Sequence, residues 1–372
     1  MSATIFPPAG PPLVDLSIKL ATLFREWGST TFAHAGYPQL EMNALADAGL
    51  LTCTLPGGLM EGSESPTADL LEMLRHIGRG NLSVGRIFEG HLNALLLIEE
   101  YGTPEQQRRW YADAAARHVF AVWNTEMADG VTFARQTDGG IHLTGAKSFC
   151  SGSTQISRPL ITGNLRKAGE ESAGWQLAVV PLDRHDPVVD RTFWTTLGMR
   201  NSVSHKIDFT GIHLGADQLL GAPDDYNRQP FLTAGSVRFA AVQLGGAEAI
   251  LHATCAYLHG VGRTDDPHQR RRVARMTVAV ESARLWLPRA GDVIDRGADA
   301  SEIIYTANMV RTVVAEACRT CLQLSDECVG ARGMLPPQDL ARLHADLLVY
   351  LRQPAPDAAL DAIGQHTLDA IS

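Results

Sequence analysis

Apolar positions recur at helical spacing in the first third of the chain and again after Pro223. In the first such segment they lie three or four residues apart, at Leu13, Leu16, Leu20 and Leu23, which is typical of a helix with one buried face. Between His118 and Gly221 the pattern changes to short apolar runs separated by Gly, Asp, Asn and Pro, which predicts strands. The chain is therefore expected to run from helices through a small β region to a bundle of long helices.

This order predicts an α+β fold with three parts. Residues 1–118 are expected to form an N-terminal helical domain, residues 119–222 a middle β domain that is a small barrel or sheet, and residues 223–372 a C-terminal four-helix bundle. Ligand-binding crevices commonly form where such layers meet. We therefore expect the functional site where the middle domain meets the helices.

Composition and charge narrow the classes of partner. The 372 residues carry 41 acidic against 32 basic side chains, for a net charge of -9. A basic surface that could follow a phosphate backbone is therefore missing, and we expect no nucleic-acid partner. No uninterrupted apolar run approaches the roughly 18 to 20 residues that a membrane-spanning helix needs. The first residues are rich in proline and lack the basic start of a secretory signal, so we expect a cytoplasmic protein.

The cysteines and histidines indicate no metal site. Six cysteines are too few for a disulfide framework in a chain of this length, so we expect free thiols. Cys318 and Cys321 form a CxxC pair, but they fall within a helical pattern, which favours a place in a helix core over a zinc or redox site. Histidines such as His344 and His366 have no second ligand at helical spacing.

Four motifs follow one another in a fixed order along the chain. They are Leu45–Leu50 with Pro56–Gly58, Tyr101–Trp110, Trp123–Glu126 with Gly145–Gly152, and Leu197–Ser202 with Leu219–Gly221. Each alone could be an ordinary helix cap or turn. Taken together they span nearly the whole chain and resemble the motifs of the acyl-CoA dehydrogenase family of flavoproteins.

The resemblance implies an FAD cofactor held at the ends of the middle strands. A flavin ring needs an apolar wall and a few donors at its polar edge. By the family match, Thr125 and the backbone near Trp123 would donate to the pyrimidine edge of the flavin. Phe149 would pack on a face of the ring, and Ser151 would lie near the nitrogen that accepts the hydride. Ordinary turn hydroxyls and a core aromatic are the alternative reading of the same residues.

In the last third of the chain the resemblance implies contacts to the far end of FAD. Arg263, Gln269 and the turn at Gly330 match the residues that meet the diphosphate and adenosine across a subunit boundary in the family, which implies a homodimer or a homotetramer. The family's Phe-Gly is replaced here by Thr264–Pro267, which contains two acids. Two acids beside a diphosphate would repel it unless they point outward.

The family's catalytic base is missing from both of its known positions. Dehydrogenation of an acyl thioester needs a carboxylate that takes the α proton while hydride passes to the flavin. At the more common position this chain has Gln353 or Pro354, and at the less common one it has Val237. None of these side chains can accept a proton usefully.

Three explanations for the missing base remain open. Asp357, three residues past Pro354, could act as a displaced base, although an Asp at a proline-rich turn is commonly a cap. His91, on a helix expected near the substrate face of the flavin, could act as an acid or base, although a structural histidine is the commoner role for such a residue. Alternatively the reaction involves no proton abstraction, as in relatives that use reduced flavin and oxygen to hydroxylate their substrates. In that case a histidine and a serine near the flavin would matter more than a carboxylate, and His91 and Ser151 could fill these roles.

Three hypotheses for the function follow. The first is an FAD-dependent oxidoreductase of the acyl-CoA dehydrogenase type that oxidises a CH–CH bond of an acyl thioester, bound to CoA or an acyl carrier protein, with an electron-transfer flavoprotein or a reductase as partner. Met127 departs from the family at a turn that touches CoA, which weakens this reading. The second is a flavin-dependent monooxygenase of the same fold. The third is a catalytically silent flavoprotein or scaffold subunit of a paired complex.

Overall fold

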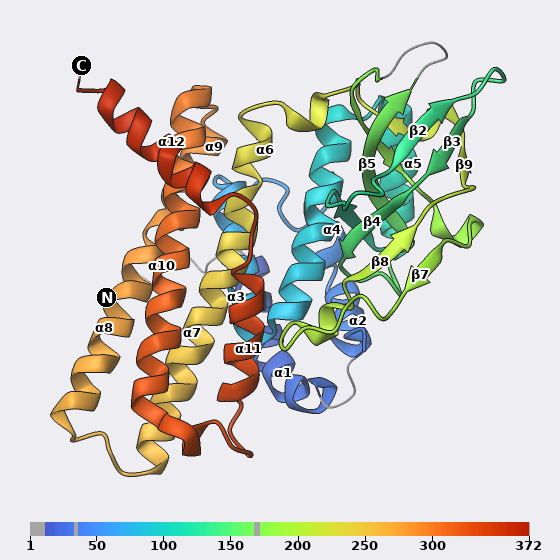
Figure 1. Ribbon diagram of the computed structural model, residues 1–372. Coiled ribbons are helices and arrows are strands. Elements are labelled where there is room, and N and C mark those ends of the chain that lie inside the picture. Colours follow the sequence, from blue (N-terminus) through green and yellow to red (C-terminus); the bar gives the residue numbers. More distant parts are fainter. Residues whose placement is uncertain (1–11, 33–35, 167–171, 372) are drawn as a thin grey trace, which may run out of the picture.

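The computed structural model describes residues 12–32, 36–166 and 172–371; its strands lie together on one side of the molecule, and most of its helices lie on the other (Figure 1). Five α-helices precede the strands in this described part, together with a short 3-10 turn, η1 (Leu50–Thr52): α1 (Pro12–Phe32), α2 (Gln39–Asp47), α3 (Pro66–Gly80), α4 (Leu82–Tyr101) and α5 (Pro104–Ala115). The helical spacing of the first third of the sequence is thus confirmed.

The strands form two sheets. They are β1 (Phe120–Trp123), β2 (Thr132–Arg135), β3 (Ile141–Thr144), β4 (Ala146–Cys150), β5 (Arg158–Arg166), β6 (Trp175–Val179), β7 (Val188–Asp190), β8 (His205–Asp208), β9 (His213–Leu214) and β10 (Leu219–Leu220). The larger sheet has the order β10-β6-β5-β2-β3-β9, with β1 paired to β5, and the smaller sheet has the order β4-β8-β7. β5 is parallel to both β1 and β2, while the other pairs are antiparallel.

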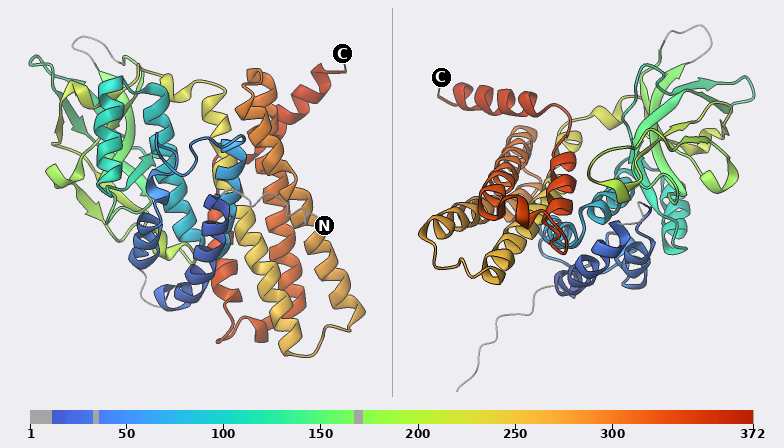
Figure 2. Two further views of the ribbon diagram at one scale, coloured as in Figure 1. Left: turned by 180° about the vertical axis from the view of Figure 1, so that it is seen from behind. Right: turned by 60° about the horizontal axis from the view of Figure 1, so that its bottom comes forward.

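The chain closes with a second helical region on the opposite side of α4 from the sheets (Figures 1 and 2). Its helices are α6 (Phe231–Ala234), α7 (Ser236–Gly260), α8 (Pro267–Arg284), α9 (Trp286–Asp295), α10 (Ala300–Gly333), α11 (Leu340–Tyr350) and α12 (Pro356–Asp369). The α+β arrangement predicted from the sequence is confirmed. None of the helices in the described part is long and apolar enough to cross a membrane.

Helix α4 is the element that joins the three regions. It contacts β1 on one side and α7 and α11 on the other. Asn81 begins the helix, because its side-chain oxygen accepts hydrogen bonds from the backbone N–H groups of Ser83 and Val84. Most of its residues are buried, so both faces of α4 are covered by protein. Any site between the sheets and the bundle must therefore be lined in part by α4.

Helices α3 and α7 pack closely across the centre of the molecule. The Arg75 guanidinium on α3 forms an ion pair of 2.5 Å with Glu248 on α7, and both side chains are nearly inaccessible to solvent. Cys318 and Cys321, the CxxC pair, are fully buried on α10, which packs against the same α7. They belong to the helix core, as the sequence indicated, and all six cysteines are unpaired.

Candidate flavin site

Two segments far apart in sequence meet at the end of β4. The backbone N–H of Ser148 donates to the carbonyl oxygen of Thr125 at 2.9 Å, which places the segment after β1 beside β4. The buried Lys147 ammonium strengthens this junction by donating to the Asn124 carbonyl and the Glu126 carboxylate. Thr125 therefore lies close to Phe149, the residue after Ser148.

Phe149 presents an aromatic surface at this junction. Its side chain is 48% exposed, although its ring meets the rings of Phe193 and Trp194 edge-on, at centroid distances of 5.1 and 6.1 Å. Its φ angle of 56° lies in the left-handed region that a bulky side chain rarely adopts, and nearby Val203 also has a positive φ, of 39°. Backbone strain of this kind is concentrated at functional sites.

Ser151 begins a chain of three serine hydroxyls. Its Oγ lies 2.9 Å from the Oγ of Ser204, which lies 2.8 Å from the Oγ of Ser202. Ser202 then donates to the carbonyl oxygen of Met199. Ser151 is 6% exposed, so this chain fixes the orientation of a hydroxyl that solvent barely reaches. Outside this chain, the Oγ of Ser153 lies 2.7 Å from the Nδ1 of His205 on β8.

Trp123 is a buried residue that holds the backbone of Ser151 in place. Its ring is 1% exposed and packs against Phe209, and its indole N–H donates to the carbonyl oxygen of Ser151 at 3.0 Å. The contact to a flavin that the sequence predicted for the Trp123 segment would therefore come through its neighbours Asn124 and Thr125, and not through the indole itself.

The residues at this junction fit a flavin ring. We call Thr125, Ser148, Phe149 and Ser151 the strand-end cradle. Thr125 is exposed, Phe149 offers an aromatic face, and the buried Ser148 Oγ has no hydrogen-bond partner in the described structure. A buried hydroxyl without a partner is costly unless a ligand or water satisfies it. An aromatic wall next to an unsatisfied donor and exposed strand-end groups is what a flavin requires.

The Leu197–Ser202 turn is anchored on α11. A Cβ atom added to Gly198 would collide with the backbone of Ala345, so only glycine permits this close approach. Next to it, the Met199 N–H donates to the Asp346 carboxylate at 2.6 Å. The Met199 carbonyl in turn accepts from Trp194 and Ser202. The turn thus connects the aromatic group around Phe149 and the serine chain to the bundle.

The hydrogen bond between Met199 and Asp346 leads us to expect that the stability of the protein depends on pH. Burial raises the pKa of Asp346 to about 6, although Arg342 and the Met199 N–H both favour the charged carboxylate. A raised folded-state pKa means that the folded protein binds this proton more tightly than the unfolded chain. Stability is therefore expected to fall as pH rises from about 4 through 6, by roughly 2–3 kcal/mol.

This contribution is isolated by comparison with Asp346→Asn, which keeps an acceptor oxygen for Met199 but cannot titrate. Urea unfolding of both proteins at pH 4 and pH 7 should show that the variant gains stability relative to the wild type at the higher pH. An equal difference at the two pH values would contradict the assignment.

His91 has a structural role in α4. Its Nε2 lies 2.7 Å from the carbonyl oxygen of Leu51, and its Nδ1 accepts the N–H of Phe120 at 3.0 Å. The side chain is fully buried, and burial lowers its pKa to about 4, against the backbone contact to Leu51, which raises it. A neutral imidazole with both nitrogens engaged has no free position for proton transfer, so we do not include His91 in the proposed reaction.

The other sequence candidates for a base are also accounted for. Asp357 is exposed in the first turn of α12, which extends away from the sheets (Figure 1). Gln353 donates its side-chain N–H to the carbonyl oxygen of Tyr350. Val237 is buried in α7. The described structure therefore places no carboxylate at either position that the family uses.

Arg263 lies in the turn between α7 and α8, Gln269 lies in the first turn of α8, and Gly330 lies near the end of α10. Arg263 forms an ion pair with Asp266 at 2.5 Å, so the acid expected to repel a diphosphate neutralises this arginine instead. Gln269 is 2% exposed and its Oε1 has no partner in the described structure. Gly330 interrupts α10 with a φ of 57°. Their role at a cofactor bound across two subunits stays a prediction.

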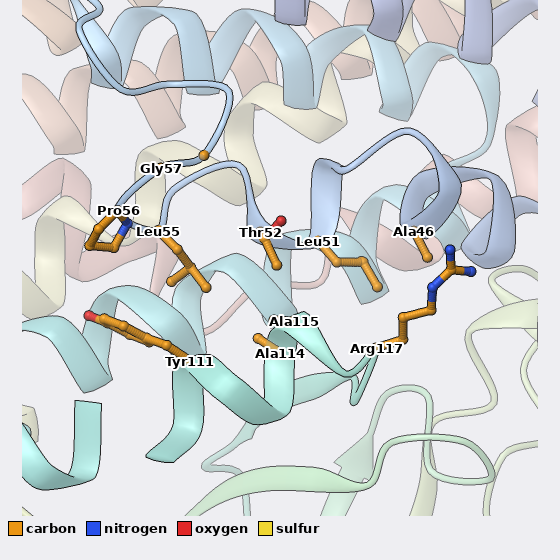
Figure 3. Close-up of a pocket in the computed structure, with 11 residues that line it drawn as sticks. Ala46, Leu51, Thr52, Leu55, Pro56, Gly57, Tyr111, Ala114, Ala115 and Arg117 are labelled. Atoms are coloured by element: carbon orange, nitrogen blue, oxygen red, sulfur yellow. The ribbon is translucent and has the colours of Figure 1, made fainter. Parts of the chain in front are cut away.

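A hollow of about 460 Å³ lies elsewhere, between the loop after η1 and helix α5 (Figure 3). Leu55 and Tyr111 line it, and Arg117 stands at one end. None of the residues that line it belongs to the strand-end cradle.

Comparison with known proteins identifies the family. The model of the acyl-CoA dehydrogenase N-terminal domain matches residues 19–118, and that of the acyl-CoA dehydrogenase C-terminal domain matches residues 229–351. The chain belongs to the acyl-CoA dehydrogenase family. It is therefore a flavin-dependent oxidoreductase of this fold, as the sequence motifs indicated.

Relatives of this chain within the family carry the names of monooxygenases. Dibenzothiophene monooxygenase of Rhodococcus qingshengii is 25% identical, with 93% of this chain and 91% of the relative covered. "Probable FMNH2-dependent monooxygenase SfnC" of Pseudomonas putida is 27% identical over 82% of this chain and 79% of its own length. The crystal structure of FMN-bound TdsC from Paenibacillus sp. A11-2 superposes with a TM-score of 0.87 at 22% identity, covering 96% of this chain and 97% of TdsC.

One group of residues was not found by sequence reasoning. Arg86, Glu89 and Arg238 are largely buried charged side chains that meet between α4 and α7. Arg86 and Glu89 stand one turn apart in an otherwise strongly apolar helix, which is a signal that could have indicated them.

Proposed function

We propose that the protein is a flavin-dependent monooxygenase that oxygenates a small organic substrate with dioxygen and a reduced flavin. One oxygen atom of dioxygen enters the substrate, the other leaves as water, and the reduced flavin is oxidised by two electrons. The observation that carries the proposal is the absence of a carboxylate from both family positions, where this chain has Val237 at one and Gln353 or Pro354 at the other. The names of the relatives support this second hypothesis over acyl thioester dehydrogenation, which is a more distant relation.

The chain's own residues would bind and orient the cofactor. Phe149 would cover one face of the ring, Thr125 would donate to its polar edge, and the serine chain would hold the Ser151 hydroxyl in one orientation. When bound, the flavin supplies the electrons and the reactivity toward dioxygen. Helix α4 and the buried ends of α7 and α11 would exclude water from the reacting atoms.

FMN is the form of flavin that we favour, in place of the FAD implied by the family resemblance. The names of two relatives specify FMN or its reduced form. In this chain Arg263, the match to the family's diphosphate contact, is already paired with Asp266. A separate reductase that delivers reduced flavin would then be the partner.

The test is oxygen incorporation under defined flavin supply. The purified protein, with FMN reduced anaerobically, is mixed with ¹⁸O₂ and a panel of small aromatic and sulfur compounds. Oxygen-18 in one product is expected. Bleaching of oxidised flavin by acyl-CoA thioesters without oxygen would favour dehydrogenation instead. Tight flavin binding with neither reaction would favour the silent scaffold.

Phe149→Ala tests the cofactor side of the proposal. Loss of one stacking face is expected to weaken FMN binding roughly 5- to 150-fold, because stacking on an aromatic side chain stabilises a planar ring by about 1–3 kcal/mol. Thermal stability should change little, since the ring is half exposed. Fluorescence titration of FMN measures the effect. Val188→Ala, at a 71% exposed position on β7, is the matched control and should bind FMN like the wild type.

A further inference from the structure

A group of buried and partly buried polar side chains lies where α4, α7 and α11 meet the short turn η5 (Asp225–Asn227). We call it the cationic cluster: Arg86, Glu89, Asn93, Tyr226, Arg238 and Tyr350. It holds two guanidinium groups and one carboxylate. Arg86 contacts Glu89 at 2.7 Å, and Arg238 donates to the side-chain oxygen of Asn93 at 2.5 Å.

The cluster carries an uncompensated positive charge. Among the residues that the structure describes, Glu89 alone forms an ion pair with Arg86, and Arg238 has only the neutral Asn93 as a hydrogen-bond partner. An unpaired guanidinium away from water is costly, because burial removes its hydration. A negatively charged ligand would offset that cost.

Two atoms of the cluster have no partner at all. The Nε of Arg238 and the hydroxyl of Tyr350 are both buried and unsatisfied in the described structure; Arg238 is 8% and Tyr350 4% exposed. Burial raises the pKa of Tyr350 well above its usual value, and raises that of Tyr226 to about 12. Both phenols therefore stay protonated at neutral pH and can donate. The side chain of Arg86 is 27% exposed, so the cluster can be reached from one side.

The segments that carry the cluster border both the strand-end cradle and the position that matches the family base. Next to Arg86 in α4 is Ile87, and a Cβ atom on Gly152, which follows Ser151, would stand 3.5 Å from its side chain. On the other side, the carbonyl oxygen of Tyr350 accepts hydrogen bonds from Gln243 and Gln353. A molecule bound beside the cradle would thus lie near the segments that carry the donors of the cluster.

We propose that the cationic cluster binds the carboxylate of a small anionic substrate, with Arg86 and Arg238 as the charged contacts and Tyr350 as a neutral donor. A guanidinium matches the planar fork of a carboxylate, and hydrogen bonds to a charged group are stronger than neutral ones. This inference rests on the proposed function, since it names the class of substrate that the monooxygenase would accept.

Benzoate and its neutral isostere benzamide test the proposal on the FMN-loaded protein. Calorimetry and the shift of the oxidised flavin spectrum are expected to show benzoate binding, with benzamide at least about tenfold weaker, because the charge-assisted hydrogen bonds are lost. Equal affinities for the two compounds, or no binding of benzoate, would overturn the proposal. The binding test uses oxidised flavin and needs no turnover, so it is independent of the oxygen-incorporation test. If the protein oxygenates neutral compounds but does not bind benzoate, only the proposed role of the cationic cluster is wrong. If it binds benzoate but oxygenates no compound of the panel, only the proposed function is wrong.

Two variants locate the binding. Arg238→Gln should weaken benzoate binding by about tenfold or more, and Tyr350→Phe by roughly five- to tenfold, without changing FMN affinity. Tyr350→Phe removes a hydroxyl that has no partner in the described structure, so the variant should fold normally even if Arg238→Gln does not. Arg228→Gln, at an exposed arginine two residues after Tyr226, is the matched control. Wild-type affinity for benzoate in the folded cluster variants would place the anion elsewhere and contradict the assignment.

Discussion

Gly245→Ala is expected to destabilise the protein by about 3 kcal/mol or more. Gly245 lies on α7, where a Cβ atom would come within 3.0 Å of the backbone of both Arg75 and Arg79 on α3. The contact is reciprocal, since a Cβ atom on Gly78 of α3 would collide with the backbone of Val242. Neither neighbour can move aside as a flexible side chain could, because the obstacles are main-chain atoms of a packed helix.

The matched control is Gly260→Ala on the same helix, where a Cβ atom meets nothing within 4 Å. This change should be neutral or slightly stabilising, because alanine is the better helix former. Urea unfolding of the two variants beside the wild type measures the difference. If Gly245→Ala were as stable as Gly260→Ala, the close approach of α3 and α7 would be wrong.

The sequence predicted the order of the elements because periodicity is a local property. Helical spacing at Leu13, Leu16 and Leu20 depends only on neighbours within a few turns, and α1 forms there as expected. The proximity of the segments that contain Thr125 and Ser148 could likewise be expected, since the motifs at 123–126 and 145–152 belong to an ordered set of four that resembles one family. Function at the level of a flavin enzyme follows from the same motifs.

The tertiary contacts that decide the roles of individual residues could not be predicted from local periodicity or motifs. His91 looked like a candidate acid or base because its partners, Leu51 and Phe120, are carbonyl and N–H groups of backbone that no side-chain pattern reveals. The close approach at Gly245 depends on the register of two helices that are far apart in sequence.

The cationic cluster is a further case of the same kind. It draws Arg86, Arg238 and Tyr350 from three helices, so the pair Arg86 and Glu89 on α4 indicates only part of it. The whole cluster is recognised only once burial and hydrogen-bond partners are known, because a charge matters most where water is excluded.

Lys147→Met is expected to destabilise the β region by about 2–4 kcal/mol and to abolish tight flavin binding together with it. The Lys147 side chain is fully buried on β4, and its ammonium contacts Glu126 at 2.6 Å and both the Asn124 carbonyl and the Thr162 hydroxyl at 3.0 Å. A methionine of similar length fills the space but removes one donor from each of these three acceptors. The segment after β1, which carries Thr125, would then keep its backbone hydrogen bond to Ser148 but lose the buried side-chain contacts that strengthen the junction.

Lys206→Met on the adjacent strand β8 is the matched control. Lys206 also forms an ion pair, with Asp129 at 2.5 Å, but both of these side chains are partly exposed. Exposed pairs contribute at most about 1 kcal/mol, because water and salt screen them. Thermal unfolding and FMN titration of the two variants are therefore expected to show a large effect for the buried Lys147 and a small one for the partly exposed Lys206. Comparable stability and FMN affinity in both would mean that Lys147 does not hold β1 and β4 together, and that the geometry of the cradle has another origin.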